Sequence, residues 1–373
     1  MTHSAPDYLI LGGGVIGLSL AFHISRQGAS VKVLDTGKPG RASPAAAGML
    51  APLAEACKPG PFLDLALNSL RRYPDFVAAL SNMGNKSDMH LQGPGMLRVA
   101  RTDAEEAALC HALSWQTSLG LPLHRLTGAE ARRLEPGLSP DVQAVVLSPA
   151  EKHIEPRLLL AALGAACRVH GAEILAVSPA TVLEATASRV HAVLSGSDRH
   201  TFGTLVLAAG AWSRALAQDF GFDVPVTPLR GQILALGPQS SAPFSHTLYT
   251  HGAYLVPRAD GRVVAGATEE WAGFAAETDD AAISGLRAEA AALLPALAEW
   301  PLHSAWAGLR PVSADGLPLL GRVPGWDNVH LATGHGRNGI LLAPVTGALM
   351  ADHLLHDAPL PTAFDPARFG SKP

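Results

Sequence analysis

The stretch YLILGGGVIGLSLAF, residues 8–22, decides the fold. Its apolar residues 8–11 predict a short buried strand, and the apolar spacing over 15–27 predicts a helix that Gly28 ends. A second apolar run, residues 31–34, predicts another buried strand. Because strands joined by a helical crossover lie parallel, the segment predicts a strand, turn, helix and strand within a parallel sheet.

The turn between the first strand and the helix carries a phosphate-binding pattern. Gly12, Gly14 and Gly17 form GxGxxG, and Asp35 ends the next strand. The glycines permit a tight turn, close approach of a pyrophosphate and close helix packing, and the acid would accept from ribose hydroxyls. An ordinary glycine-rich turn is the alternative, but the strand, helix and acid all agree with the fingerprint. The fingerprint alone does not distinguish NAD from FAD.

The rest of the chain predicts a mixed α/β (α+β) protein with two interleaved domains. Residues 204–209 predict a buried strand, and residues 328–355 predict a strand, a glycine-rich turn and a helix that opens near Asn338. Residues 232–268 are strand-rich, with a hairpin turn at 259–261. We therefore expect a Rossmann-type domain built from residues 1–90, 148–224 and 305–373, and a second domain, an antiparallel sheet with flanking helices, built from residues 91–147 and 225–304.

Composition excludes several classes of protein. Of 373 residues, 48% are hydrophobic and 16% charged, which excludes a mainly disordered chain, and the net charge of -4 argues against a nucleic-acid partner. The odd, dispersed Cys57, Cys110 and Cys167 fit a reducing cytoplasm. The glycine-broken amino end predicts no membrane anchor. The histidines form neither HxH nor HExxH with supporting acids, so no metal site is expected.

Seven segments spread along nearly the whole chain resemble a known family, the glycine and D-amino-acid oxidase group of flavoproteins. Within that group the chain looks most similar to the glycine oxidases linked to thiamin-thiazole synthesis. The segments are YLILGGGVIGLSLA, SPAAAGMLAP, HIEP, LAAGAW, TLYTHGAYLVPRADGRVVAGAT, WAGLRPVSADGLPLLG and ATGHGRNGILLAPVTG.

The resemblance implies that FAD is the cofactor. Its binding is expected to be noncovalent, because no cysteine follows Cys167 to supply a thioether link. Ala42 stands where relatives often carry a hydroxyl residue, so one side-chain contact is expected to be missing. The implied cofactor contacts are Gly12, Gly14, Val15, Ile16, Gly17, Asp35, Thr36, Ala42, Ser43, Ala47, Gly48, Met49, Ile154, His335, Gly336, Arg337, Asn338, Gly339, Ile340 and Leu341.

Three side chains are implied as catalytic. Arg310 would hold the substrate carboxylate through a two-pronged ion pair, Tyr254 would add its hydroxyl, and Arg337 would lie beside the substrate pocket. Taken without the family, Arg310 would be read as a surface ion pair, Tyr254 as a half-buried strand aromatic and Arg337 as a solvated arginine of a capping turn. In the family the HGRNGIL helix start faces the flavin, where its dipole would stabilise negative charge.

The sequence departs from the family pattern in the substrate pocket. Gly252 stands where close glycine oxidases carry a histidine, and His251 cannot replace it because a one-residue shift turns the side chain to the opposite face of a strand. The missing bulk predicts a wider pocket, so glycine need not be the sole best substrate. Ala51 is expected near the entrance as a further determinant of pocket size.

The resemblance implies oxidative deamination of glycine or another small amino acid, such as sarcosine or a small D-amino acid. Hydride transfer to the flavin N5 would give an imine that hydrolyses to a 2-oxo acid and ammonia, and dioxygen would be reduced to hydrogen peroxide. We expect a pocket poor in acids, no protein base and a homo-oligomer. The alternatives are a dehydrogenase that uses a quinone or another carrier, a catalytically silent flavin-binding subunit, and an NAD-dependent dehydrogenase.

Overall fold

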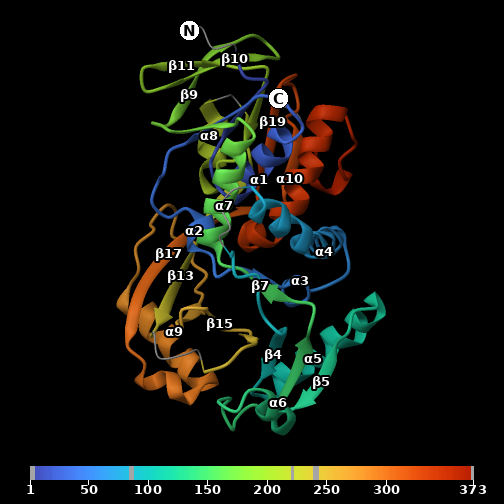
Figure 1. Cartoon of the computed structure of the whole chain (residues 1–373), viewed down its shortest axis with the longest axis vertical. Helices are drawn as coiled ribbons and strands as arrows, with labels where there is room; N and C mark the ends of the chain where they lie inside the picture. The colour runs from blue at the N-terminus through green and yellow to red at the C-terminus, as the bar shows by residue number, and fades with distance from the viewer. Residues whose placement is uncertain (1–4, 84–87, 220–221, 238–242, 371–373) are drawn as a thin grey trace.

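The chain forms an elongated molecule with one large sheet in each half (Figure 1). The computed structural model describes residues 5–83, 88–219, 222–237 and 243–370. Both chain ends lie in the half that holds α1 (Val15–Ser25), β19 (Val329–Thr333) and α10 (Gly339–His356). The other half holds β4 (Met96–Ala100) and α9 (Asp280–Leu293).

The first sheet has six strands among the described residues, in the order β18-β19-β12-β1-β2-β8. β1 pairs in parallel with β2 on one side and with β12 on the other, which confirms the predicted parallel unit. β18 is an antiparallel edge strand on β19. The remaining bounds are β1 Tyr8–Leu11, β2 Val31–Asp35, β8 Glu173–Ala176, β12 Thr204–Leu207 and β18 Leu319–Arg322.

Both faces of this sheet are covered, as a parallel sheet requires. Successive side chains alternate between faces, so Ile10 packs among α1, α7, α10 and α4, whereas Leu9 and Leu11 pack against a small three-stranded sheet. Figure 1 shows that small sheet at the end of the molecule beside the amino terminus. The covering elements are α4 Pro61–Ser81, α7 Pro156–Val169, β9 Ala180–Ala185, β10 Val190–Ser195 and β11 Asp198–Thr201.

The second sheet has eight strands among the described residues, in the order β17-β13-β16-β15-β14-β4-β6-β5. All neighbours are antiparallel except β14 and β4, and the predicted hairpin is confirmed as β15 and β16. Helices α6 and α9 cover it with Ala131, Leu286 and Ala290. The further bounds are β5 His124–Thr127, α6 Gly128–Leu134, β6 Ala144–Ser148, β13 Val226–Leu236, β14 Thr247–Tyr249, β15 Tyr254–Pro257, β16 Val263–Gly266 and β17 Leu302–Ser313.

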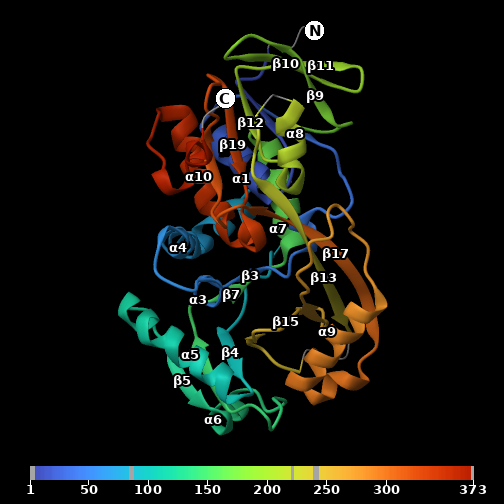
Figure 2. The same ribbon diagram turned by 180° about the vertical axis from the view of Figure 1, so that it is seen from behind.

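The long strand β17 joins the two halves of the molecule. It pairs with β13 along its length, and both strands extend from the second sheet toward the first (Figure 2). The expected domain boundary before residue 305 therefore falls inside a strand of the second sheet. The connecting elements are α2 Ala42–Ala45, β3 Met49–Leu50, α3 Pro52–Glu55, α5 Asp103–Gln116, η1 Thr117–Leu119, β7 Lys152–His153, η2 Gly210–Trp212, α8 Ser213–Asp219, η3 Pro295–Glu299, η4 Gly336–Asn338, η5 Thr362–Phe364 and η6 Pro366–Phe369.

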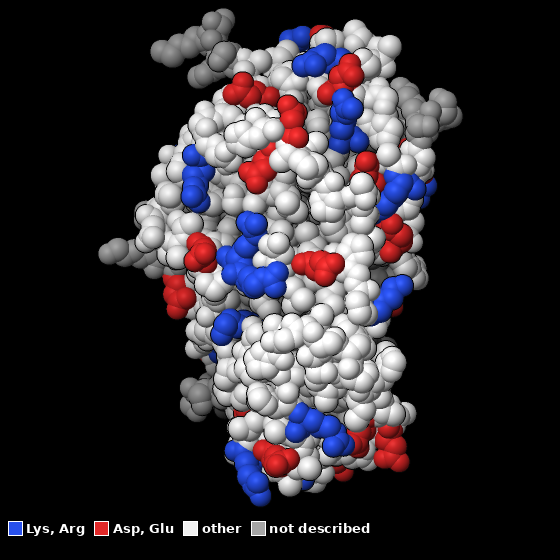
Figure 3. Space-filling model, turned by 90° about the vertical axis from the view of Figure 1, so that its right-hand side faces the viewer, with Lys and Arg blue, Asp and Glu red and all other residues white. Residues whose placement is uncertain are grey.

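The helical segment Gly336–His356 is long and apolar enough to cross a membrane by length and composition alone. However, 56% of its most apolar window is buried inside the structure, where α10 packs against α1 and α4. The apolar sequence of α10 is therefore accounted for by the core of the first half. On the face drawn in Figure 3, acidic and basic side chains are interspersed rather than gathered by sign.

Stability should fall as the solution becomes acidic, because several histidines are buried in neutral form. Burial lowers the pKa of His153 to about 4, and the pKa values of His330 and His335 to about 3. Below the ordinary value near 6.5, the unfolded chain therefore binds protons that the folded chain does not, so stability is lost as pH falls from about 6.5. Each histidine costs about 1 kcal/mol between about pH 7.5 and 5.5.

Among the described residues, the buried carboxyl groups of Glu55 and Glu151 oppose this trend, because burial raises the pKa of both. Burial raises the pKa of Glu151 to about 7, so this group favours the folded state as pH falls through 7. We therefore expect the free energy of unfolding to fall by about 2 kcal/mol over that interval, measured by denaturant titration of the holoprotein. The interval from about pH 8.5 to 7.5, where these histidines do not titrate, serves as the control. Unchanged or rising stability below pH 7 would contradict the neutral histidines.

Candidate active site

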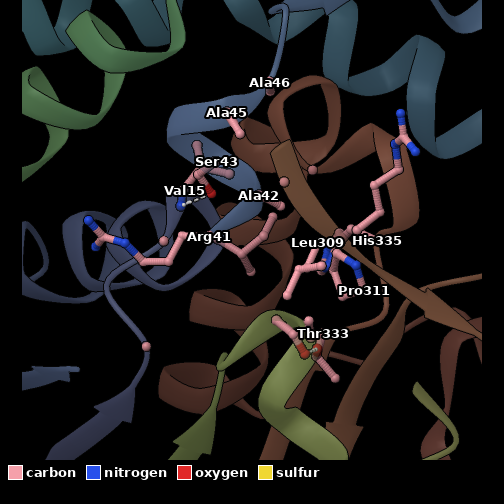
Figure 4. Close-up of a pocket in the computed structure, with 18 of the residues that line it drawn as sticks. Val15, Arg41, Ala42, Ser43, Ala45, Ala46, Leu309, Pro311, Thr333 and His335 are labelled. Carbon is pink, nitrogen blue, oxygen red and sulfur yellow. Dashed lines mark hydrogen bonds between the residues drawn. The ribbon is translucent and has the colours of Figure 1, made fainter. Parts of the chain in front are cut away.

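A cavity of about 450 Å³ lies where the first sheet meets β13 and β17. Leu11, Asp35 and Thr333, the last residues of β1, β2 and β19, line it. Ligands of open α/β sheets bind at the carboxyl ends of the parallel strands, and this cavity occupies that position. In Figure 4 the α2 segment with Ala42 and Ser43 forms one wall, and the β17 residues Leu309 and Pro311 form the facing wall.

The glycine fingerprint forms a backbone cradle at one end of the cavity. Gly12 has φ +118, and a Cβ there would lie 2.4 Å from the carbonyl oxygen of Ala208. A Cβ at Gly17 would lie 2.0 Å from the carbonyl oxygen of Gly12, so α1 packs directly on the turn. Gly14 caps α1 with no side-chain hydrogen bond. The cradle thus fits a pyrophosphate, which needs bare backbone at a helix N-terminus.

The small-residue segment after β2 forms the adjoining wall. Ser43 Oγ accepts from the backbone N–H of Val15 at 3.0 Å, the bond drawn in Figure 4. Trp306 Nε1 donates to the carbonyl oxygen of Ala45 at 2.9 Å, and a Cβ on Gly308 would lie 2.7 Å from that alanine's Cβ. The segment has small side chains because β17 packs closely on one side while the cavity lies on the other.

Asp35 points to a partner that the sequence did not indicate. Its Oδ2 accepts from Arg41 Nη1 at 2.6 Å, and both residues line the cavity. The predicted contact of this carboxylate with ribose hydroxyls stays a prediction, and Arg41 adds a positive charge to the same part of the cavity.

The glycine-rich turn before α10 lines the opposite part of the cavity. Asn338 caps α10 with no side-chain hydrogen bond, which leaves the N–H groups of its first turn toward the cavity. His335 is buried and its Nε2 lies 3.1 Å from Thr346 Oγ1, a contact that fixes the turn. This helix start fits the electron-rich edge of a flavin ring, which gains negative charge on reduction.

Two glycines make room for the two side chains expected to bind a substrate carboxylate. Arg310 on β17 lies across Gly231 of the neighbouring strand β13, where a Cβ would be 2.3 Å from its Nη2. Tyr254 on β15 lies across Gly266 of β16, where a Cβ would be 2.5 Å from its hydroxyl oxygen. Both side chains line the cavity.

The partly buried guanidinium of Arg310 is held by backbone oxygens. Its Nη1 donates to the carbonyl oxygen of Thr268 at 2.9 Å and to that of Arg230 at 3.4 Å. Among the described residues no carboxylate forms an ion pair with it. Burial lowers the pKa of Arg310, and burial raises the pKa of Tyr254, so the phenol stays protonated and able to donate near neutral pH.

The third predicted side chain, Arg337, is paired with acids. Its Nε lies 2.9 Å from Glu55 Oε2, and its Nη1 lies 2.8 Å from Glu269 Oε1. Burial acts against the charge of Arg337, but the two carboxylates outweigh it and raise its pKa. Burial raises the pKa of Glu55, against the pull of Arg337. Glu55 lines the cavity, so one acid that the sequence did not indicate stands beside Arg337.

The short helix α3, which carries Glu55, is anchored by buried polar groups. The backbone N–H of Leu53 donates to Glu151 Oε1 at 2.7 Å. The carbonyl oxygen of Leu53 accepts from Gln116 Nε2 at 2.9 Å and from Arg98 Nη1 at 3.3 Å. The second sheet and α5 thus fix the backbone two residues before Glu55.

Most of the predicted site residues come together around this one cavity. Gly17, Ile154 and Leu341 lie outside its lining: Gly17 packs beneath the turn, and the carbonyl oxygen of Ile154 lies where a Cβ of Gly48 would be. Gly252 is exposed, with nothing within 4 Å of a Cβ built on it. The predicted residues that line the cavity are Gly12, Gly14, Val15, Ile16, Asp35, Thr36, Ala42, Ser43, Ala47, Gly48, Met49, Ala51, Tyr254, Arg310, His335, Gly336, Arg337, Asn338, Gly339 and Ile340.

Sequence reasoning missed Arg41, Glu55 and Glu269. Glu55 lies three residues after the small-residue segment and Arg41 directly precedes Ala42, so a charged residue beside predicted ligand-facing backbone was the signal available for both. Glu269 gives no local signal, because its partner Arg337 is brought close only by the fold. No group of three or more His, Cys, Asp or Glu in the described part of the chain is arranged to hold a metal ion.

The cavity has a glycine cradle at the end of a parallel sheet, and a second sheet covers it and contributes Arg310, which has no carboxylate partner among the described residues. This arrangement defines an oxidoreductase with a dinucleotide cofactor. The chain belongs to the DAO family of FAD dependent oxidoreductases, which matches residues 7–353. Its cofactor is FAD, and it is a FAD-dependent amino-acid oxidase of the glycine oxidase type.

Relatives of this family match almost the whole chain. It is 33% identical over 350 residues to a glycine oxidase of Bacillus licheniformis, which covers 94% of this chain and 93% of the relative. It is 36% identical over 374 residues to the bifunctional protein ThiO/ThiG of Synechocystis, covering 98% of this chain and 54% of that protein. The crystal structure of glycine oxidase from Geobacillus kaustophilus superposes with a TM-score of 0.90 at 30% identity, covering 99% and 98% of the two chains.

Proposed function

We propose that the protein oxidises glycine or another small amino acid, such as sarcosine or a small D-amino acid, with dioxygen as the electron acceptor. An imine would be released and hydrolysed to a 2-oxo acid and ammonia, and dioxygen would be reduced to hydrogen peroxide. The observation that carries this proposal is Arg310, a partly buried guanidinium in the cavity whose hydrogen bonds among the described residues go to backbone oxygens. Such a group favours a ligand with a carboxylate.

Arg310 and Tyr254 would orient the substrate. The guanidinium receives the carboxylate and the phenol donates a second hydrogen bond to it, which fixes the direction of the α-carbon. When bound, FAD supplies the two-electron acceptor for the hydrogen on that carbon. The role of the chain is then to position the substrate and to hold charge, and a neutral substrate amine needs no protein base.

The pocket size supports a small but not uniquely defined substrate. Ala51 lines the cavity with a methyl group, whereas Gly252 is exposed and does not belong to the lining, so the expected widening of the pocket at Gly252 stays a prediction. The names of the relatives at 33% and 30% identity favour glycine.

An anaerobic spectrum tests the proposal. Glycine added to the yellow protein without oxygen should bleach the flavin, and air should restore the colour with formation of one hydrogen peroxide per turnover. Bleaching by sarcosine or a D-amino acid but not by glycine would show that the substrate is another small amino acid. Rapid bleaching with recovery in air that is far slower than bleaching, and fast recovery with a quinone, would contradict the oxidase and favour the dehydrogenase. A flavin that no amino acid bleaches would contradict the proposal and favour the silent subunit.

A further inference from the structure

Arg310 and Arg337, the two arginines at the end of the cavity that holds Tyr254, differ in what surrounds them. Arg337 forms ion pairs with Glu55 at 2.9 Å and with Glu269 at 2.8 Å. Arg310 donates to backbone carbonyl oxygens and has no carboxylate partner within the described residues. This end of the cavity therefore offers one arginine that is free for an anionic ligand and a second that is already paired with acids.

The two acids reach Arg337 from different elements. Glu55 comes from α3 and its side chain is only 8% exposed, so it is a fixed part of the cavity wall. Glu269 follows Thr268, whose carbonyl oxygen holds Arg310, and its side chain is 50% exposed. Glu269 does not line the cavity itself, so it acts on the ligand through Arg337.

The neighbouring acid faces the other way. Glu270 pairs with Arg230, and its Oε1 accepts from Gln232 Nε2 at 2.8 Å. Two consecutive glutamates thus pair with two different arginines, and only the first of them pairs with an arginine that lines the cavity. This pair offers a matched comparison with the same residue type, the same charge and adjacent positions.

The charges set how many carboxylates the cavity can accept. The four groups Arg310, Arg337, Glu55 and Glu269 sum to zero, so one substrate carboxylate on Arg310 already gives this end of the cavity an excess negative charge. A second carboxylate beside Arg337 would lie close to two like charges, and like charges at short range repel. It would also have to displace an acid that is already hydrogen-bonded to the guanidinium.

We propose that Glu269 is a positioning residue that, together with Glu55, keeps Arg337 occupied and thereby restricts the active site to amino acids with a single carboxylate. The inference rests on the proposed function, because it takes Arg310 as the carboxylate partner. Removing the charge of Glu269 frees Nη1 of Arg337 for a second anionic group and admits dicarboxylates.

The test compares Glu269→Gln with Glu270→Gln as holoenzymes. The probes are glycolate and its dicarboxylate analogue diglycolate, which lack the reactive amine, and binding is followed by their perturbation of the flavin spectrum. We expect wild type to bind glycolate more tightly than diglycolate. In Glu269→Gln the affinity for diglycolate relative to glycolate should rise at least about tenfold, a change of about 1.4 kcal/mol. In Glu270→Gln this ratio should stay as in wild type.

Turnover gives a second readout of the same ratio. In Glu269→Gln, kcat/KM for iminodiacetate relative to glycine should rise by a similar factor, mainly through KM. An unchanged ratio in Glu269→Gln, or the same change in Glu270→Gln, would overturn the inference while leaving the proposed function intact. A wild-type flavin spectrum that responds to neither probe, together with no bleaching by amino acids, would overturn the proposed function and the inference together. The half-exposed position of Glu269 lets the variant fold, and retained yellow colour verifies it.

Discussion

Gly14→Val is expected to purify as a folded protein that contains almost no FAD. Gly14 lines the cavity at the start of α1 with φ -76, a backbone conformation that valine tolerates. Its Cβ would lie 3.2 Å from Ser43 Oγ, and the methyl groups beyond it would fill the space that the pyrophosphate needs. The ratio of flavin to protein absorbance, before and after incubation with excess FAD, measures the loss.

The control is a glycine with the same substitution and free space around it. Gly285 lies within α9, and no atom lies within 4 Å of a Cβ built there. Gly285→Val should keep its full flavin content, and circular dichroism should show both variants folded. Normal flavin content in Gly14→Val would show that the pyrophosphate does not lie against this turn.

Arg310→Ala is expected to raise KM for the amino acid at least about tenfold while the protein stays yellow. Removing one partner of a buried, hydrogen-bonded charge pair costs about 2 to 5 kcal/mol, and each 1.4 kcal/mol is about tenfold in affinity. The flavin should be retained, because the side chain of Arg310 extends from β17 across Gly231 and is held by the carbonyl oxygen of Thr268. Steady-state kinetics with glycine, at matched flavin content, provides the measurement.

Two further variants define what Arg310 contributes. Arg310→Lys keeps a positive charge but loses the fork, so its KM should lie between those of wild type and Arg310→Ala. Arg199→Ala is the control. It removes an arginine on β11 from its exposed ion pair with Glu184 on β9, and it should leave KM unchanged. If Arg310→Ala left KM unchanged, another group would have to hold the carboxylate.

The parts of the fold that the sequence made readable are those specified locally. The glycine fingerprint and the hairpin turn at 259–261 each act through neighbours in the chain, and both are present. Strand order is not local: β12 lies beside β1 only because the chain returns after a long excursion. The helix α4, which contains Pro74, was not among the predicted elements.

The same distinction applies to the site. Gly12 and Gly14 were readable because their backbone roles are set within a few residues of the chain. Arg310 and Tyr254 were readable from their family segments. The two acids paired with Arg337 could not be predicted from the sequence. Glu55 and Glu269 lie far apart in the chain and meet only after both sheets have formed. A formal charge count over the sequence cannot say which arginine is left unpaired.

The interleaved strand order also affects how the protein is made. During synthesis β1 and β2 leave the ribosome early, but β12, the other neighbour of β1, follows nearly 200 residues later. At about 5 to 20 residues per second, the nascent chain would spend roughly 10 to 40 s with one edge of β1 open. An open apolar strand edge can pair wrongly. We therefore expect the newborn chain to depend on chaperones until β12 and β19 complete the sheet. We also expect FAD to bind only after the chain has been released from the ribosome.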